Sequence, residues 1–405
     1  MQEPDEKQEI ELPALALKKG EDSRLRAGHA WIFSNEVDTR KTPLTGFKPG
    51  MHAVVVDHTD NPIGLAYVNP NALICARLVA RGLKHPIDRS LIVHRLKVAL
   101  GLRERLYGRP FYRLVYGESD GLPGLVLDRY GDVVVGQIGT GDLVLQRLHS
   151  GGAVEKVLKP RALVWKNAGS VRKLESLPEY VETAFGELPE RVIAEEGGLE
   201  FEIDVVHGQK TGWFYDQRAN RDSMAPYVRD GRVLDVFSYV GAWGVRAASF
   251  GASEVLCIDS SKPAVEAIRA NAIANRVGER VTAIEEDAFD ALKRLRQSKE
   301  RFDAVIVDPP AFVKRKKDFA EGRLAYRRIN EAAMQLLGKD GILITCSCSW
   351  HMSRDALLEA VNAGARHLDR HVQVLSRLQQ APDHPVNPAI PETDYLKGFI
   401  CRVLI

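Results

Sequence analysis

The sequence predicts an α/β protein with a largely parallel, doubly wound sheet in its C-terminal half. Three observations predict this fold. Strand-like and helix-like segments alternate regularly from residue 232 onwards. Short β-like runs and turn signals fill residues 12–85, which is typical of a small β-barrel. The chain of 405 residues also exceeds the roughly 100–200 residues of an ordinary domain, so we expect several domains.

The elements of the last predicted domain, residues 191–405, follow from hydrophobic periodicity. Amphipathic runs with 3.6-residue spacing separate the apolar runs, so helices are expected on both faces of a parallel sheet. The predicted strands are RVLDVF (232–237), EVLCID (254–259), VTAIEED (281–287), FDAVIVD (302–308) and GILITCSC (341–348). Ahead of this domain lies a predicted helix, SLIVHRLKVALGLRERL, followed by a segment with both helix-like and strand-like runs. This pattern predicts a central α/β domain over residues 86–190.

Composition excludes some classes of protein. The chain is 45% hydrophobic and 27% charged, and none of its apolar runs approaches the roughly 20 residues of a membrane span. The acidic start MQEPDEKQEIE is unlike a secretory signal, so we expect a cytoplasmic protein. The net charge is only +2, so a nucleic-acid site must be a local patch. Five cysteines without C-x-x-C spacing argue against a disulfide framework and a metal site.

Acidic residues and a glycine loop follow the predicted strands, where an open α/β sheet binds its ligand. A carboxylate after the second strand can accept hydrogen bonds from two ribose hydroxyls, and one after the third can reach an adenine amino group. Each alone is more often a turn or helix-cap residue. Together, and without a G-x-G-x-x-G phosphate loop, they favour S-adenosylmethionine. The candidate cofactor contacts are Asp235, Phe237, Ser238, Tyr239, Gly241, Asp259, Ser260 and Asp287.

The fourth predicted strand ends in DPPAF, residues 308–312. Two prolines fix an extended turn, which can hold Asp308 and Phe312 against a planar base. The carboxylate would accept hydrogen bonds, with Asp308 also bordering the cofactor, and the Phe312 ring would stack on the base.

Two cysteines end the fifth predicted strand. By the period of two, Cys346 and Cys348 point to one face, with Cys348 nearer the site. A thiol beside a methyl donor suits methylation at C5 of a pyrimidine, because thiolate addition at C6 pushes electron density to C5. We therefore predict Cys348 as the nucleophile and Asp308 as the carboxyl group that holds the N3 and amino edge of cytosine. Cys346 fits an inert buried residue better, with a role in product release as the alternative.

Several long segments resemble the ribosomal RNA large subunit methyltransferase I family. They are LKKGEDSRLRAGHAWIFSNEV, GESDGLPGLVLDRYG, HGQKTGWFYDQR, DVFSYVGAWG, DPPAF, CSCS, DHPV and YLKGFICRVL, and they extend over most of the chain. The resemblance implies a PUA β-barrel, a central α/β domain and a Rossmann-like class I methyltransferase domain whose last strand is antiparallel. It also implies S-adenosyl-L-methionine as cofactor, RNA as partner and C5 of a 23S rRNA cytosine as target, with Cys348 and Asp308 in the roles above. The proline motif lacks the second cysteine of many RNA cytosine-C5 methyltransferases.

Other predicted contacts lie outside the strand ends. In TGWFYDQR, Phe214 and Gln217, together with Arg218, could close over the cofactor or the target. The predicted RNA contacts are Lys18, Lys19, Arg24, Arg26 and Trp31 in the barrel, and Phe312, Lys314, Arg315, Lys316 and Lys317 after the proline motif. We expect a homodimer, a common state of such folds. Two alternatives stay open: an amino methyltransferase acting on adenine or cytosine, which needs no thiol, and an RNA-binding ribosome-assembly factor without turnover.

Overall fold

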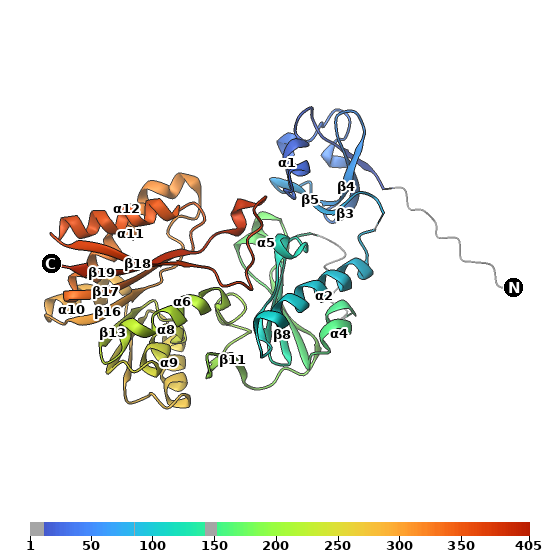
Figure 1. Cartoon of the computed structure of the whole chain (residues 1–405). Helices are drawn as coiled ribbons and strands as arrows, with labels where there is room; N and C mark the ends of the chain where they lie inside the picture. The colour runs from blue at the N-terminus through green and yellow to red at the C-terminus, as the bar shows by residue number, and fades with distance from the viewer. Residues whose placement is uncertain (1–11, 85, 142–151) are drawn as a thin grey trace. The chain divides into compact units, whose positions relative to one another are not determined.

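The computed structural model describes residues 12–84, 86–141 and 152–405 (Figure 1). The acidic start, which bears on the predicted absence of a secretory signal, lies outside the described residues. The chain forms two compact units, one of residues 1–188 with 385–391 and one of residues 189–384 with 392–405. A short segment of the predicted last domain, residues 385–391, therefore belongs to the first unit. In this segment Ala389 packs closely on Gly28: a Cβ added to Gly28 would lie 2.8 Å from the Ala389 Cβ. The three-domain division itself stays a prediction.

The first unit begins with a five-stranded sheet of strand order β1-β3-β4-β5-β2. A bridge between Leu17 and Val37 links the chain just after each of the two edge strands, so the sheet curls toward closure as in a barrel. Its core includes Leu15, Ile32 and Val55, all fully buried. The elements are β1 (Ala14–Ala16), α1 (Ser23–Arg26), β2 (Trp31–Phe33), β3 (Met51–Val56), β4 (Pro62–Val68) and β5 (Ile74–Arg81).

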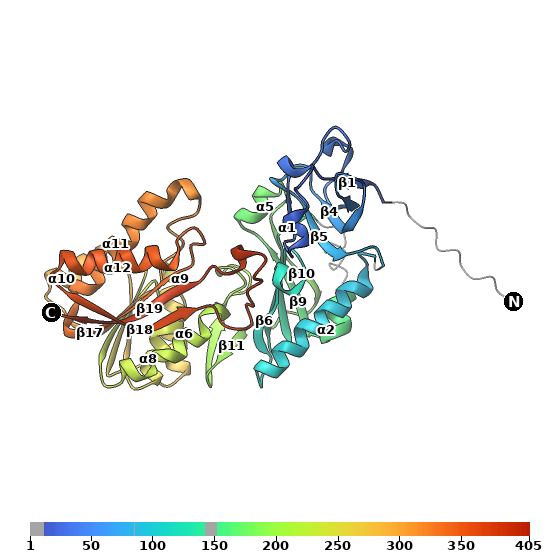
Figure 2. The same ribbon diagram turned by 45° about the horizontal axis from the view of Figure 1, so that its top comes forward.

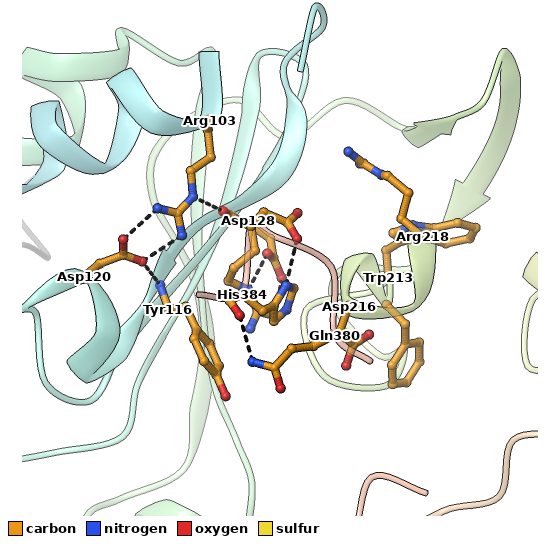
Figure 3. Close-up of polar contacts among 12 residues, drawn as sticks. Arg103, Tyr116, Asp120, Asp128, Trp213, Asp216, Arg218, Gln380 and His384 are labelled. Carbon is orange, nitrogen blue, oxygen red and sulfur yellow. Dashed lines mark hydrogen bonds and ion pairs between the residues drawn. The ribbon is translucent and has the colours of Figure 1, made fainter. Parts of the chain in front are cut away.

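A second five-stranded sheet, of order β10-β9-β8-β7-β6, follows in the same unit. Its strands are β6 (Phe111–Tyr116), β7 (Leu125–Tyr130), β8 (Val133–Ile138), β9 (Ala162–Asn167) and β10 (Tyr180–Gly186). Helices α2 (Arg89–Leu106) and α4 (Gly152–Leu158) pack against each other (Figure 1), α2 lies beside this sheet (Figure 2), and α5 (Ser170–Leu174) precedes β10. Asp120 accepts hydrogen bonds from both Nη atoms of Arg103, at 2.6 and 2.7 Å, and from the Tyr116 amide at 2.6 Å (Figure 3). This ion pair holds α2 to the turn after β6.

The second unit contains a seven-stranded sheet of order β15-β14-β13-β16-β17-β19-β18. The first five strands in sequence run parallel, while β19 is antiparallel to both β17 and β18. This confirms the predicted doubly wound sheet and its antiparallel last strand. The strands are β13 (Arg232–Val236), β14 (Glu254–Asp259), β15 (Val281–Glu285), β16 (Phe302–Val307), β17 (Leu337–Ser347), β18 (His371–Gln379) and β19 (Lys397–Leu404).

Helices cover both faces of this sheet (Figure 1). Helices α10 (Ala288–Gln297), α11 (Phe319–Gln335) and α12 (Arg354–His367) share one hydrophobic core with the sheet, whereas α8 (Ala242–Ser249) and α9 (Lys262–Ala274) pack on β13, β14 and β15 from the other side. The hairpin of β11 (Val192–Glu196) and β12 (Leu199–Ile203), followed by α6 (Arg218–Ser223) and α7 (Ala225–Val228), precedes the sheet.

The strand order reverses between β13 and β16, which is the point where such sheets bind ligands. Val236 pairs with Val307 across these strands, and Val307 pairs in turn with Thr345 of β17. The chain therefore leaves the sheet at neighbouring places after β13, β16 and β17. The predicted loop, carboxylate and thiol lie at these three exits.

Candidate active site

The loop after β13 has an unusual backbone. Phe237, Tyr239 and Gly241 all have positive φ, at 66°, 51° and 88°. Only glycine adopts this conformation without cost, so the two aromatic residues are held there by their surroundings, as is common at ligand sites. A Cβ on Gly244, in the first turn of α8, would lie 2.3 Å from the Cys257 Sγ. The glycine therefore lets α8 pack directly on β14.

Asp235 and Ser238 support this loop from inside the protein. The fully buried Asp235 accepts a hydrogen bond from the Gly244 amide at 3.0 Å. Ser238 donates its hydroxyl to the Asp235 carbonyl at 2.7 Å and accepts one from the Ile258 amide at 3.1 Å. Burial raises the pKa of Asp235 to about 7. The structure thus shows a loop-supporting role for both residues, while their predicted contact with the cofactor stays a prediction.

The two carboxylates predicted to hold the nucleoside lie at one edge of the sheet. Asp259, at the end of β14, accepts hydrogen bonds from the amides of Tyr239 at 2.8 Å and Ser261 at 2.9 Å. Asp287, after β15, is exposed and caps α10 by accepting from the Phe289 amide at 2.9 Å. The structure therefore adds a local role to each carboxylate, a loop tie for Asp259 and a helix cap for Asp287. Ser260, the predicted cofactor contact that follows Asp259, is exposed.

Asp308 lies at the centre of the site and accepts two side-chain hydrogen bonds on one oxygen. Gln217 Nε2 donates to Asp308 Oδ2 at 2.9 Å, and Trp243 Nε1 donates to the same atom at 3.0 Å. The Gln217 Oε1 in turn accepts from Asn220 at 2.6 Å. Burial raises the pKa of Asp308 to about 6 even though the Trp243 hydrogen bond opposes that rise. Gln217 is a predicted site residue, whereas Trp243 and Asn220 were missed because nothing in the local sequence places them beside Asp308.

The two cysteines differ in their surroundings. Cys346 is fully buried with its Sγ 3.9 Å from Gln217 Oε1, and burial raises its pKa well above the usual value. Cys348 is half-buried with its Sγ 4.0 Å from the Pro309 carbonyl oxygen. Burial raises the pKa of Cys348 too, but the positive charge of Lys210 opposes the rise. Ser347 points the other way and donates to the Tyr326 hydroxyl at 2.8 Å, as the alternation of a strand predicts.

A strap formed by residues 207–217 is tied to the loop after β13. Phe214 meets Tyr239 edge to face at 5.5 Å between ring centroids. The Tyr239 hydroxyl donates to the Gly212 carbonyl at 3.2 Å and accepts from the Gln209 amide at 3.1 Å. Lys210 Nζ lies 4.3 Å from the Phe214 ring centroid. This strap is how Phe214 and Gln217, distant in sequence from the strand ends, reach the site.

Glu196 anchors the chain just after the strap. Arg221 donates to both Glu196 carboxylate oxygens at 2.6 Å, and Trp213 Nε1 donates to one of them at 3.2 Å. Although burial disfavours its charge, the guanidinium of Arg221 holds the pKa of Glu196 below its usual value, with help from Arg218 and Arg246. This fully buried ion pair is another feature that the sequence analysis missed.

Comparisons with known proteins give a consistent picture. A family model described as S-adenosylmethionine-dependent methyltransferase matches residues 173–398, and a PUA-like domain model matches residues 15–81. A ribosomal RNA large subunit methyltransferase I from Photobacterium profundum is 36% identical over 406 residues, covering 96% of this chain and 99% of the relative. One from Vibrio cholerae is 36% identical over 403 residues, covering 97% and 100%. The chain belongs to the ribosomal RNA large subunit methyltransferase I family.

Solved structures share the fold of this family member. A putative SAM-dependent methyltransferase from Streptococcus mutans has a TM-score of 0.81 at 21% identity, covering 96% of this chain and all of that one. A putative methyltransferase complexed with SAH has a TM-score of 0.80 at 20% identity, with the same coverage. The predicted fold class, family and S-adenosylmethionine cofactor are thereby confirmed. In this family member, contact of the strand-end carboxylates and of the loop after β13 with the cofactor stays a prediction.

The basic run after the proline motif lies next to the turn that follows Cys348. The Val313 amide donates to Ser349 Oγ at 3.1 Å, which joins the two segments. Arg315 pairs with Asp318 at 3.0 Å, and the Phe312 ring packs against Tyr326 with centroids 4.9 Å apart. The exposed residues of the run are Lys314, Arg315, Lys316 and Lys317. The structure brings these predicted RNA contacts to the site of this family member.

The predicted RNA contacts of the barrel are largely engaged within the protein. Arg24 pairs with Glu36 at 2.6 Å, and Arg26 pairs with Asp22 at 2.6 Å and with Asp57 at 2.9 Å. Trp31 Nε1 donates to Glu118 at 2.8 Å. Lys18 and Lys19 are exposed, with Lys18 Nζ donating to the Asn35 carbonyl at 2.7 Å. RNA contact at this barrel stays a prediction, and the lysines are its most accessible members.

Two negative findings hold for the described part of the chain. No group of three or more His, Cys, Asp or Glu residues there is arranged to hold a metal ion. His384, in a motif-like segment, pairs through Nδ1 with Asp383 Oδ1 at 2.9 Å, and its carbonyl accepts from Gln380 at 2.7 Å (Figure 3). Across the same described residues, no helix combines the length and apolar character needed to cross a membrane.

Proposed function

We propose that this protein methylates C5 of a cytosine in 23S rRNA, with Cys348 as a covalent nucleophile. The observation that carries the proposal is the pairing of two half-buried groups at the ends of adjacent strands, the thiol of Cys348 after β17 and the carboxyl group of Asp308 after β16. The name of the 36% identical relatives, ribosomal RNA large subunit methyltransferase I, supports rRNA as the substrate class.

The reaction would proceed through an adduct with the target base. The Cys348 thiolate would attack C6, so that an S–C6 bond forms and the electron pair of the C5=C6 bond moves to C5. S-adenosylmethionine, when bound, supplies an electrophilic methyl group on a sulfonium. C5 would form a bond to that methyl carbon as the sulfonium–methyl bond breaks. A base would then remove the C5 proton, so that the electron pair of the C5–H bond re-forms the C5=C6 bond. The S–C6 bond breaks at the same time, and its electron pair leaves with the Cys348 thiolate.

Asp308 would prepare the cytosine for this attack. With a pKa near 6, a fraction of Asp308 is protonated close to neutral pH, and a protonated carboxyl group can donate a hydrogen bond to N3. Withdrawing electrons at N3 makes C6 more electrophilic. Gln217 and Trp243 both donate to Oδ2, so in the described part of the chain Oδ1 is the oxygen left for the cytosine edge.

RNA would be held by positive charge close to the nucleophile. The exposed run Lys314–Lys317 would neutralise phosphates flanking a flipped-out cytosine, and the barrel would add further RNA contacts. The homodimer and the cytoplasmic location belong to this proposal as predictions, testable by light scattering and by fractionation of cells.

Nucleoside mass spectrometry of unmodified 23S rRNA tests the proposal. Wild type, Cys348→Ala and Cys346→Ala would each be incubated with the RNA and S-adenosylmethionine. We expect 5-methylcytidine from wild type, none from Cys348→Ala, and product from the matched control Cys346→Ala, because that thiol is fully buried.

Other products would reject the mechanism in distinct ways. An N-methylated adenine or cytosine, formed equally by Cys348→Ala, would identify an amino methyltransferase. RNA binding without any methylated nucleoside would identify an assembly factor.

A further inference from the structure

Trp350 is an exposed aromatic residue two positions after the predicted nucleophile. It is 41% exposed, whereas the other four tryptophans are buried or half-buried. Two residues span at most about 7 Å of backbone, so the Trp350 side chain begins close to Cys348. Exposure alternates here, with Cys348 half-buried, Ser349 buried and Trp350 exposed. Single exposed apolar side chains are common on protein surfaces, so the surroundings of Trp350 decide what it can do.

The turn that carries Trp350 is held from several sides. The Met352 amide donates to the Ser349 carbonyl at 3.0 Å, which closes the turn. The buried Lys397, at the start of β19, donates from Nζ to the Ser349 carbonyl at 2.7 Å and to the Met352 carbonyl at 2.9 Å. The His351 ring meets the indole edge to face, with centroids 4.6 Å apart. The indole therefore stands on a fixed turn, so a planar ligand can stack on it with little loss of conformational entropy.

A basic segment lies beside this turn. The Ser349 hydroxyl accepts a hydrogen bond from the Val313 amide at 3.1 Å. Lys314 follows Val313 directly, just as Trp350 follows Ser349, so the exposed run Lys314–Lys317 begins next to the turn of the indole. An aromatic ring beside lysines suits single-stranded RNA, because the ring stacks on a base and the ammonium groups neutralise phosphates.

We propose that Trp350 is a stacking platform for an unpaired RNA base next to the cytosine that Cys348 attacks. The proposal rests on the proposed function in placing RNA at this site. A cytosine that reaches the thiol must leave its stack, and the base beside it then loses a stacking partner. The indole of Trp350 replaces that partner, so it acts as a binding residue that favours a single-stranded target and takes no part in bond making.

Filter binding of a short single-stranded oligocytidylate over a range of KCl concentrations, without S-adenosylmethionine, tests the proposal. The variants are Trp350→Ala, which removes the ring, and Trp350→Phe, which keeps a smaller ring. The matched control is Ile273→Ala, which removes a 70% exposed apolar side chain from the last turn of α9. Because α9 returns from the end of β14 to the start of the parallel strand β15, that turn lies at the opposite edge of the sheet.

We expect Trp350→Ala to bind the oligocytidylate about 5- to 150-fold more weakly than wild type at every KCl concentration, with an unchanged salt slope. Trp350→Phe should lie between these two proteins, and Ile273→Ala should match wild type. Double-stranded RNA of the same length should bind equally well to wild type and Trp350→Ala, because its bases are already stacked.

Three outcomes would overturn the proposal. They are wild-type affinity of Trp350→Ala for the oligocytidylate, an equal loss of affinity for double-stranded RNA, and no binding of the oligocytidylate by wild type. The first would leave the indole to a protein partner, and the second would indicate phosphate contacts or general damage. None of these measurements involves methyl transfer, so failure of the proposed chemistry would be seen separately, in the nucleoside analysis.

Discussion

Gln217 and Asp308 are 91 residues apart in sequence and are joined by a hydrogen bond of 2.9 Å from Gln217 Nε2 to Asp308 Oδ2. The bond links the strap of residues 207–217 to the exit of β16, and Trp243 adds a second donor from α8. These contacts hold the carboxyl group in place, while burial keeps its pKa near 6. The site therefore keeps a carboxyl group that resists ionisation.

Asp308→Asn should change the pH dependence of stability. Because the folded-state pKa of about 6 is above the usual aspartate value of 3.8, the folded protein binds more protons than the unfolded chain between these pH values. That stability is fully present below pH 3.8 and is lost as pH rises through 6. The asparagine side chain does not titrate, so the variant does not lose this stability as pH rises. The free energy of unfolding of the variant minus that of wild type should therefore increase by at most about 3 kcal/mol from pH 4 to pH 8. Urea unfolding of both proteins at several pH values measures this difference.

The control for this experiment is Asp303→Asn, an exposed carboxylate near the start of the same strand. Equal pH dependence in both variants would contradict the assignment to Asp308. The Asp308 variant should also transfer the methyl group more slowly, because an amide N–H is a weaker acid than a carboxyl O–H and draws less electron density from N3.

Glu196→Gln should destabilise the second unit. The substitution leaves Arg221 buried without its carboxylate, and breaking a buried pair in this way costs about 3–5 kcal/mol. Chemical unfolding monitored by tryptophan fluorescence would measure the loss, since Trp213 contacts Glu196. Glu202→Gln removes an exposed ion pair with Arg191 on the same hairpin and should cost little. Similar losses in the two variants would argue against a special role for the buried pair.

Gly244→Ala should impair both stability and cofactor binding. The added Cβ would lie 2.3 Å from Cys257 Sγ and 3.2 Å from Asp235 Oδ2, so α8 must shift at a cost of about 1–3 kcal/mol. Isothermal titration with S-adenosylhomocysteine should show weaker binding. Gly101→Ala, in the middle of α2 with open space around it, is the control and should raise stability by up to about 1 kcal/mol. Unchanged binding in Gly244→Ala would place the cofactor elsewhere.

Charge removal in the run Lys314–Lys317 should weaken RNA binding and its salt dependence. Each lysine that neutralises a phosphate contributes a slope of about 0.7 in a plot of log affinity against log salt for single-stranded RNA. Lys316→Gln and Lys317→Gln should each reduce the slope in filter-binding assays over a range of KCl concentrations. Arg24→Gln should instead reduce stability, because Arg24 pairs with Glu36. A slope that none of the lysines changes would exclude phosphate contacts at this run.

Local patterns in the sequence determined the order and type of the elements. Periods of 2 and 3.6 residues depend only on near neighbours, so the strands ending at Val236, Asp259, Val307 and Ser347 were predictable, as were the helices between them. The same patterns predicted that Cys346 and Cys348 point to one face and Ser347 to the other. The strand-end residues predicted the cofactor, and the family resemblance added the antiparallel last strand.

Tertiary structure alone decided which side chains meet. Trp243 of α8 reaches Asp308, and Lys397 of β19 reaches the Ser349 carbonyl, and no local pattern indicates such contacts. Likewise, only the fold shows that Trp31 donates to Glu118 and that Glu196 pairs with Arg221. The physical reason is that strand order and helix packing bring distant residues together, and burial and neighbouring charges then change their pKa values. The sequence thus determined which groups stand at the strand ends, and the packed structure decided how they are held and charged.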